Sequence, residues 1–97
     1  SNKILLISIL RKDVENDNDK KLINSIIKFE FVQSTKSKNI DQNEPETELE
    51  LLAIDLFKRE HNFEINLLFS KNRFITLSSE VIEATLEDQK LEHDKNN

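Results

Sequence analysis

The stretch "RFITLSSEVIEATLED", residues 73–88, decides the fold because its hydrophobic spacing changes halfway along. In its first half, Ile75 and Leu77 fall two positions apart, which is the spacing of a half-buried β-strand. After Ser79 the apolar residues fall at helical spacing instead. The sequence therefore predicts a strand at 73–78 that leads directly into a helix.

The predicted C-terminal helix runs over residues 80–89. Ser78 or Ser79 can cap its start, and two glutamates, Glu80 and Glu83, lie near its positive end. Its apolar stripe consists of Ile82, Leu86 and Gln89, flanked by Val81 and Thr85. A helix with one narrow stripe is expected to cover one face or one end of a sheet.

Four strands are predicted upstream, at residues 3–11, 21–34, 48–60 and 62–70. The first is apolar on both faces, so we expect both faces to be covered. In the second, Ile23, Ile27, Phe29 and Phe31 should share the inward face, and Asn24 with Ser25 allows a bulge.

The third strand has a competing helical interpretation, since leucine and glutamate favour helices. We favour a strand with a bulge near Leu51. The apolar residues before and after this position alternate in different phases, and one extra residue would bring them to the same face. The fourth strand alternates cleanly, with Phe63, Ile65, Leu67 and Phe69 inward.

The connection to the fifth strand can hold two or three residues. A two-residue loop would place Phe69 opposite Phe74. We predict a three-residue loop of Lys71, Asn72 and Arg73, which places Phe69 opposite Ile75, with Asn72 or its neighbour in the left-handed region.

These elements predict an α+β domain that is mostly β: a strongly twisted antiparallel sheet of about five strands with one C-terminal helix. A half barrel like that of pleckstrin-homology domains is the architecture we expect. The domain would span residues 1–88, with a mobile polar loop at 34–47 and a polar tail at 89–97.

Composition narrows the function. The chain has 97 residues, no glycine, no cysteine and a net charge of −5 with mixed signs. The missing glycine excludes the phosphate-binding loops of nucleotide-binding domains, and the missing cysteine excludes disulfides and thiolate chemistry. The charge argues against nucleic acid and anionic membranes as partners, and the longest apolar run is too short to span a bilayer. We expect a soluble, cytoplasmic protein.

Two stretches resemble a known family. "LELLAIDLF" (residues 49–57) and "ITLSSEVIEATLED" (residues 75–88) are similar to domain of unknown function 2948, an alphaproteobacterial family of small uncharacterised proteins. The residues that match are Leu51, Leu52 and Ala53 in the first stretch, and Leu77, Glu80, Ile82, Glu83, Leu86 and Asp88 in the second. "KFEFVQSTKSKNID" (residues 28–41) also resembles the family's preceding strand, so the resemblance covers about residues 3–88.

The resemblance implies no activity. It implies further sequence before the first strand, consisting of a strand, a helix and another strand, and these 97 residues contain no counterpart. The family's usual residues after the final helix, often proline with an aromatic, are replaced here by "QKLEHDKNN" (residues 89–97).

No group of residues forms a convincing catalytic, cofactor-binding or metal site. Two isolated histidines, His61 and His93, are expected to be solvated. An acidic ladder is expected to be a solvated approach to a strand: Glu44, Glu46, Glu48 and Glu50. A basic patch for a phosphate group would need the first two strands to pair, and would consist of Arg11, Lys12, Lys36 and Lys38.

We therefore expect a non-catalytic binding or protein-interaction module without metal or cofactor. The alternatives are an accessory domain or subunit of an enzyme and a small-molecule-binding regulator. An apolar pocket with convergent polar groups would favour the regulator, and an exposed apolar face would favour the interaction module.

The first strand also predicts a partner. One helix cannot cover both faces of a five-stranded sheet, so we expect a second copy or another protein to complete it. On this expectation, Ile7→Asp or Ile9→Asp would disrupt a dimer.

Overall fold

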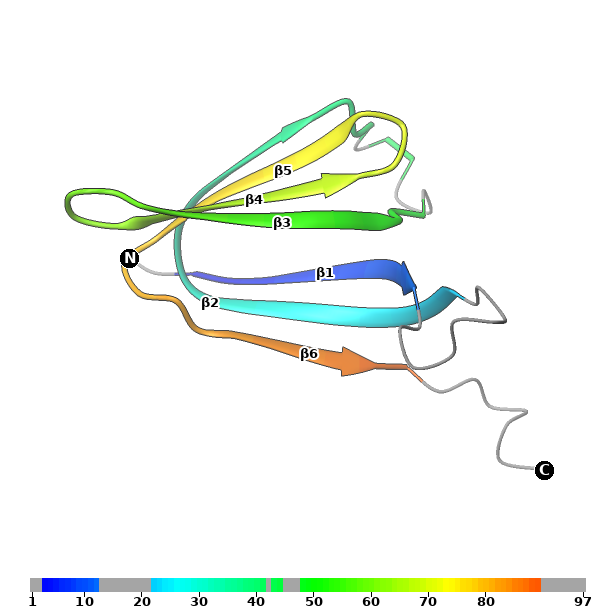
Figure 1. Cartoon of the computed structure of the whole chain (residues 1–97), viewed down its shortest axis with the longest axis horizontal. Coiled ribbons are helices and arrows are strands. Elements are labelled where there is room, and N and C mark those ends of the chain that lie inside the picture. The colour runs from blue at the N-terminus through cyan, green and yellow to red at the C-terminus, as the bar shows by residue number, and fades with distance from the viewer. Residues whose placement is uncertain (1–2, 13–21, 42, 45–47, 90–97) are drawn as a thin grey trace.

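The computed structural model describes residues 3–12, 22–41, 43–44 and 48–89. These residues form one six-stranded sheet in the order β1-β2-β5-β4-β3, with β6 paired to β2 (Figure 1). The strands are β1 (Lys3–Lys12), β2 (Leu22–Lys38), β3 (Leu51–Lys58), β4 (Phe63–Phe69), β5 (Arg73–Ser79) and β6 (Ala84–Asp88). Every pair of neighbouring strands is antiparallel, so the predicted antiparallel, mostly β architecture is confirmed.

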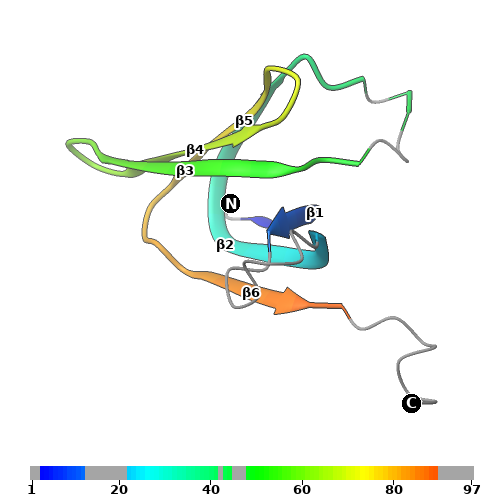
Figure 2. The same cartoon turned by 45° about the vertical axis from the view of Figure 1, so that its right-hand side comes forward.

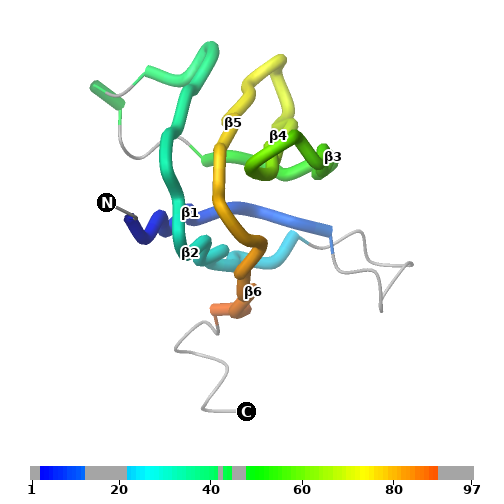
Figure 3. The backbone as a smooth tube through the Cα atoms, turned by 90° about the vertical axis from the view of Figure 1, so that its left-hand side faces the viewer, coloured from blue at the N-terminus to red at the C-terminus, as the bar shows by residue number. Residues whose placement is uncertain are grey.

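The long strand β2 folds the sheet into two layers. Its first half pairs with β1 on one edge and β6 on the other, and its second half pairs with β5. Figures 1 and 2 show β2 turning back between these halves. Figure 3 shows the chain from β5 into β6 following the same corner, where the Glu30 N–H donates to the Glu83 carbonyl at 2.9 Å.

The corner contains a β-bulge. Lys3 is paired with Val32 and Leu5 with Phe29, so two β2 residues oppose one β1 residue. One of the two is Phe31, whose φ of 60° lies in the left-handed region. The bulge therefore lies at Phe31, and the predicted bulge at Asn24 and Ser25 is wrong, because the register with β1 is continuous through those residues.

The core lies between the two layers. Its buried apolar residues are Ile7, Ile9, Ile27, Phe29, Val32, Ile65, Leu67, Phe69, Ile75 and Leu77. The predicted inward face of the fourth strand is confirmed at three positions, since Phe63 is only half-buried. The inward face predicted for β2 is correct at Ile27 and Phe29 but wrong at Phe31, because the bulge shifts the phase and buries Val32 instead.

The predicted C-terminal helix is wrong. Residues 84–88 form β6, and the described part of the chain contains no helix. Ser79 does not cap a helix, because its hydroxyl donates to a backbone carbonyl and its nearest acceptor is that of Val81. The pleckstrin-homology-like arrangement required a helix against the sheet, so it is not supported.

The hairpin between β4 and β5 confirms the loop length but not the register. Phe69 pairs with Arg73 and Leu67 with Ile75, so Ser70, Lys71 and Asn72 form the loop. The loop lies one residue earlier than predicted, so Phe69 does not face Ile75, although both side chains are buried on the same face. Both Lys71 and Asn72 have left-handed φ values.

The observed extents of β2 and β3, on either side of the polar middle of the chain, can be compared with the predicted ones. β2 continues through residues 34–38, which pair with β5, so this part of the predicted mobile loop is strand. β3 is a strand, as favoured, and its register shifts between Leu51 and Ala53, which confirms the predicted bulge near Leu51. The predicted tail lies outside the described residues from position 90 onward.

Candidate functional site

An apolar groove opens into the core between the two layers, and we call it the core groove. Its volume is about 260 Å³, and its walls come from β2, β3, β4 and β6. Ile54, Leu56, Ile82 and Leu86 contribute to the lining, and Arg11 and Thr85 are its two polar residues. A cavity of ~150 Å³ can hold one benzene molecule, so this groove has room for about two apolar side chains.

The groove exposes side chains that belong to the inner face of the sheet. Ile54 is paired with buried Leu67, and Leu56 with buried Ile65, so both residues of β3 point to the core side. They are nevertheless 50% and 55% exposed. On the other wall, Leu86 is paired with buried Ile27 but is 51% exposed. The core is therefore open on the side where β3 and β6 lie.

Both strands beside the opening are edge strands. β3 ends the path β1-β2-β5-β4-β3, and β6 pairs only with β2 among the described strands. Around the start of β3 the described residues record two further backbone bonds, from the Leu10 N–H to the Leu49 carbonyl and from the Ser70 N–H to the Glu50 carbonyl. Unpaired N–H and C=O groups along an edge can pair with another strand.

The hydrogen-bond phase of β6 identifies which of its N–H groups face outward. The Glu83 carbonyl accepts from Glu30, and the Gln89 N–H donates to the Asn24 carbonyl at 2.7 Å. In an antiparallel ladder these bonds recur at every second residue, so the odd-numbered residues of β6 bond to β2. The N–H groups of Ala84 and Leu86 therefore point to the free edge.

One end of the groove carries a polar cluster formed by Arg11, Ser25 and Asp88. Arg11 Nη2 donates to Asp88 Oδ2 at 2.7 Å, and Arg11 Nε donates to Asp88 Oδ1 at 3.1 Å, which gives a bidentate ion pair. The buried Ser25 hydroxyl donates to Asp88 Oδ1 at 2.6 Å. The hydrogen bonds from Arg11 and then Ser25 lower the pKa of Asp88, and the charge of Arg11 adds to this effect.

The cluster attaches the last strand to the first two. Asp88 ends β6, Arg11 lies near the end of β1 and Ser25 lies in the first half of β2. Because Arg11 already binds a carboxylate, its charge at the groove is compensated. The groove is therefore an apolar surface, and it does not offer an uncompensated cation to a ligand.

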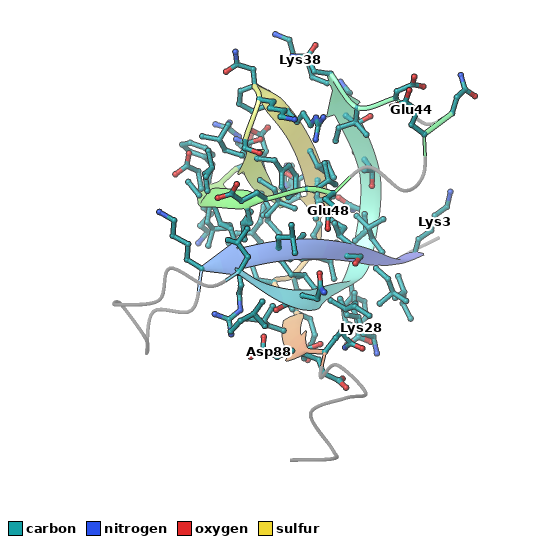
Figure 4. All side chains as sticks on the ribbon, turned by 90° about the vertical axis from the view of Figure 1, so that its right-hand side faces the viewer. Lys3, Lys28, Lys38, Glu44, Glu48 and Asp88 are labelled. Atoms are coloured by element: carbon teal, nitrogen blue, oxygen red, sulfur yellow. The ribbon has the colours of Figure 1, made fainter. Side chains whose placement is uncertain are left out.

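The predicted basic patch does not form. Arg11 and Lys12 belong to the end of β1, which pairs with the start of β2, whereas Lys36 and Lys38 lie at the other end of β2. In Figure 4, Lys38 and Asp88, the partner of Arg11, lie on opposite sides of the molecule, at the top and the bottom of the view.

The histidines and acidic residues form no site in the described residues. The exposed His61 lies 4.0 Å from Glu60, and Glu44 and Glu48 are exposed. His93 and Glu46 lie outside the described residues, and Glu50 is half-buried at the start of β3. Within the described ranges no group of three or more histidine, cysteine, aspartate or glutamate residues could hold a metal ion.

None of the described segments forms a helix with the length and apolar character needed to cross a bilayer. A cytoplasmic location stays a prediction.

The comparisons with known proteins identify the family. The family model described as "Protein of unknown function (DUF2948)" matches residues 7–96. The chain belongs to this family. No curated protein and no solved structure matches the chain. The resemblance to this family that was expected from the strands and the C-terminal segment is thereby confirmed. The description of the family assigns no activity to the DUF2948 chain.

Sequence reasoning missed the core groove and the Arg11–Ser25–Asp88 cluster. Arg11 and Asp88 are 77 positions apart, and no local pattern connects them. Asp88 was one of the residues that carried the family resemblance, and the structure gives it a physical task, which is to bind Arg11. The alternation of Ile54 and Leu56 was a visible signal for one groove wall, but it did not reveal that the opposite wall is β6.

Proposed function

We propose that this DUF2948 chain is a non-catalytic protein-interaction module whose core groove receives an apolar β-strand from another polypeptide. The observation that carries the proposal is the exposure of Ile54, Leu56 and Leu86, which belong to the inner face of the sheet yet are about half exposed.

The composition of the groove favours a polypeptide over a small polar molecule. Sites for small molecules combine an apolar wall with several convergent polar groups that fix the orientation of the ligand. Here the lining offers Thr85 and an Arg11 that is bound to Asp88. The interaction module is therefore preferred to the small-molecule regulator, and an accessory role beside an enzyme stays a special case of the same interaction.

The two free edges favour a strand as the occupant. A strand beside β3 or β6 would pair with unpaired backbone groups and would direct every second side chain into the groove. This mode of recognition combines main-chain hydrogen bonds for affinity with side-chain pockets for specificity.

The energy available is suitable for a reversible complex. Complete burial of a leucine or isoleucine side chain contributes about 1.5–3 kcal/mol, so covering a half-exposed one contributes roughly 1 kcal/mol. Four such side chains line the groove: Ile54, Leu56, Ile82 and Leu86. Their combined contribution is roughly 4 kcal/mol before main-chain bonds are added.

Site-specific photocrosslinking in living cells tests the proposal. A benzoylphenylalanine in place of Asp55, on the exposed β3 edge, should give an adduct with a polypeptide, and adding Leu86→Lys to the same chain should remove the adduct. The matched control carries the same photoreactive residue in place of Lys36, which is exposed on the half of β2 that pairs with β5.

The proposal is refuted if the Asp55 variant gives no polypeptide adduct. It is also refuted if the control gives the same adduct, or if Leu86→Lys leaves the adduct unchanged. Mass spectrometry of the adduct identifies whether the captured polypeptide is another protein or a second copy of the chain.

A further inference from the structure

We infer that the occupant of the core groove is a second copy of this chain, joined about a two-fold axis so that β3 of each copy pairs with β6 of the other. This inference rests on the proposed function and names its partner. Two copies would close each other's core through the same pair of edges, so the assembly would end at a dimer.

The strand directions permit this arrangement. β3 is antiparallel to β4, and in Figure 1 the arrows of β4 and β6 point the same way, so β3 and β6 run in opposite directions across the groove. A two-fold axis along the strand direction brings β3 of one copy beside β6 of the partner subunit. The two strands are then antiparallel, and the second pair of edges forms by the same rotation.

The side-chain phases also agree. The inner face of β3 presents Ile54 and Leu56, and that of β6 presents Ala84 and Leu86. A register that pairs Leu56 with Ala84 of the partner subunit and Ile54 with Leu86 of the partner subunit keeps all four side chains in the groove. This register also pairs the large Leu56 with the small Ala84 of the partner subunit.

Charge selects this pairing over the pairing of like edges. The segment that leads into and through β6 contains Glu83, Glu87 and Asp88, with no basic residue between positions 80 and 89. Pairing β6 with β6 of the partner subunit would bring two acidic segments together, which is unfavourable. β3 ends at Lys58, and the antiparallel register brings this lysine to the acidic start of β6.

The absence of natural cysteines permits a direct test by disulfide crosslinking. Asp55 lies between Ile54 and Leu56, and Thr85 lies between Ala84 and Leu86, so the proposed register places Asp55 opposite Thr85 of the partner subunit. Antiparallel cross-strand pairs have Cα atoms about 4.5–5.5 Å apart, within the range that a disulfide requires. Mixing a tagged Asp55→Cys chain with an untagged Thr85→Cys chain under mild oxidation should therefore give a mixed disulfide dimer.

The Asp55→Cys chain alone is the matched control. It should form little dimer, because its two cysteines lie on different edges, and equal crosslinking of this chain by itself would show that β3 pairs with β3. Failure of the mixed chains to crosslink better than either single chain overturns the inference.

Sedimentation of the full chain supplies the second readout. The unmodified chain should sediment as a dimer that dissociates on dilution, and Leu86→Lys should weaken the dimer at least tenfold while the far-ultraviolet circular dichroism stays unchanged. Leu6→Lys, at an exposed leucine on the outer face of β1, should leave the dimer intact. A chain that is monomeric at every concentration overturns the dimer, while a polypeptide adduct at Asp55 would still support the proposed function with a different partner.

Discussion

At the scale of single residues, Asp88 joins the last strand to the first two through Arg11 and Ser25. Its carboxylate accepts bonds from a guanidinium and from a buried hydroxyl, and both interactions favour the ionised form. The local sequence gives no hint of this cluster, because Asp88 is 77 positions from Arg11 and 63 from Ser25.

The cluster predicts a specific dependence of stability on pH. Because the pKa of Asp88 is lower in the folded chain than its ordinary value of 3.8, the folded state binds this proton less readily than the unfolded chain does. The stabilisation is therefore complete above pH 3.8 and is lost as the pH falls through the lowered pKa. Urea unfolding at about pH 6 and about pH 3 should show a smaller acid-induced loss for Asp88→Asn than for the unmodified chain.

Glu87→Gln is the matched control for this experiment, because it removes the neighbouring carboxylate of the same strand. It should keep the acid-induced loss of the unmodified chain. Equal losses in Asp88→Asn and the unmodified chain would contradict the account.

Positive φ angles are the second residue-scale feature. In a chain without glycine the sequence predicts that asparagine or aspartate takes these positions, and Asn39 and Asn72 do so. Lys71, the neighbour of Asn72 in the predicted loop, also has positive φ, and so does Phe31, which the sequence could not indicate. At Phe31 the corner of β2 imposes the left-handed conformation, although it costs about 1–2 kcal/mol for a residue with a Cβ.

The difference in the free energy of unfolding between a glycine and an alanine variant should therefore have opposite signs at two positions of β2. Phe31→Gly should be more stable than Phe31→Ala by about 0.5–1 kcal/mol, because relief of the left-handed penalty exceeds the entropy cost of glycine. Lys36→Gly, at a regularly paired position, should be less stable than Lys36→Ala by about 0.5–1 kcal/mol. Urea unfolding of the four variants measures both differences. If the alanine variant is the more stable one at both positions, Phe31 is not strained.

At the scale of elements, the strands were predictable and the C-terminal segment was not. Period-two spacing located β1 to β5, since β1, β2, β4 and β5 bury alternate side chains and β3 turns Ile54 and Leu56 to the same face. After Ser79 the segment fits two periods, because Ile82 and Leu86 are four apart and Ile82, Ala84 and Leu86 are two apart. Pairing with the free edge of β2 favours a strand over a helix for this segment. No local sequence pattern indicates this long-range pairing.

Proline substitutions distinguish the strand from a helix. The Thr85 N–H points to β2, whereas the Ala84 N–H points to the free edge and Ala84 is the first residue of the strand. Thr85→Pro should lower the free energy of unfolding by at least about 1 kcal/mol, because it removes a ladder hydrogen bond. In dilute protein, where the chain is not paired with a second copy, Ala84→Pro should be tolerated, and two equally destabilised variants would contradict the assigned hydrogen-bond phase of β6.

At the scale of the whole molecule, the sequence predicted an unfinished surface at the first strand. The expectation rested on the two apolar faces of β1, and the structure buries Ile7 and Ile9 in the chain's own core while Ile4 and Leu6 stay exposed. Ile7→Asp or Ile9→Asp would therefore test the core and not an interface. The core groove between β3 and β6 is a separate apolar opening, and the sequence could not reveal it because the sheet had first to bend at Phe31.

The central claim is that a second copy of the chain closes the core groove by pairing its β3 with β6, and amide hydrogen exchange along β6 tests it most directly. The N–H groups of Thr85 and Glu87 bond to β2 and should exchange slowly at every concentration, while those of Ala84 and Leu86 face the free edge. We predict that Ala84 and Leu86 exchange slowly in concentrated protein and fast after dilution or in the Leu86→Lys variant. Fast exchange at these two amides at every concentration, with slow exchange at Thr85 and Glu87, would show that the groove stays open and would contradict the claim.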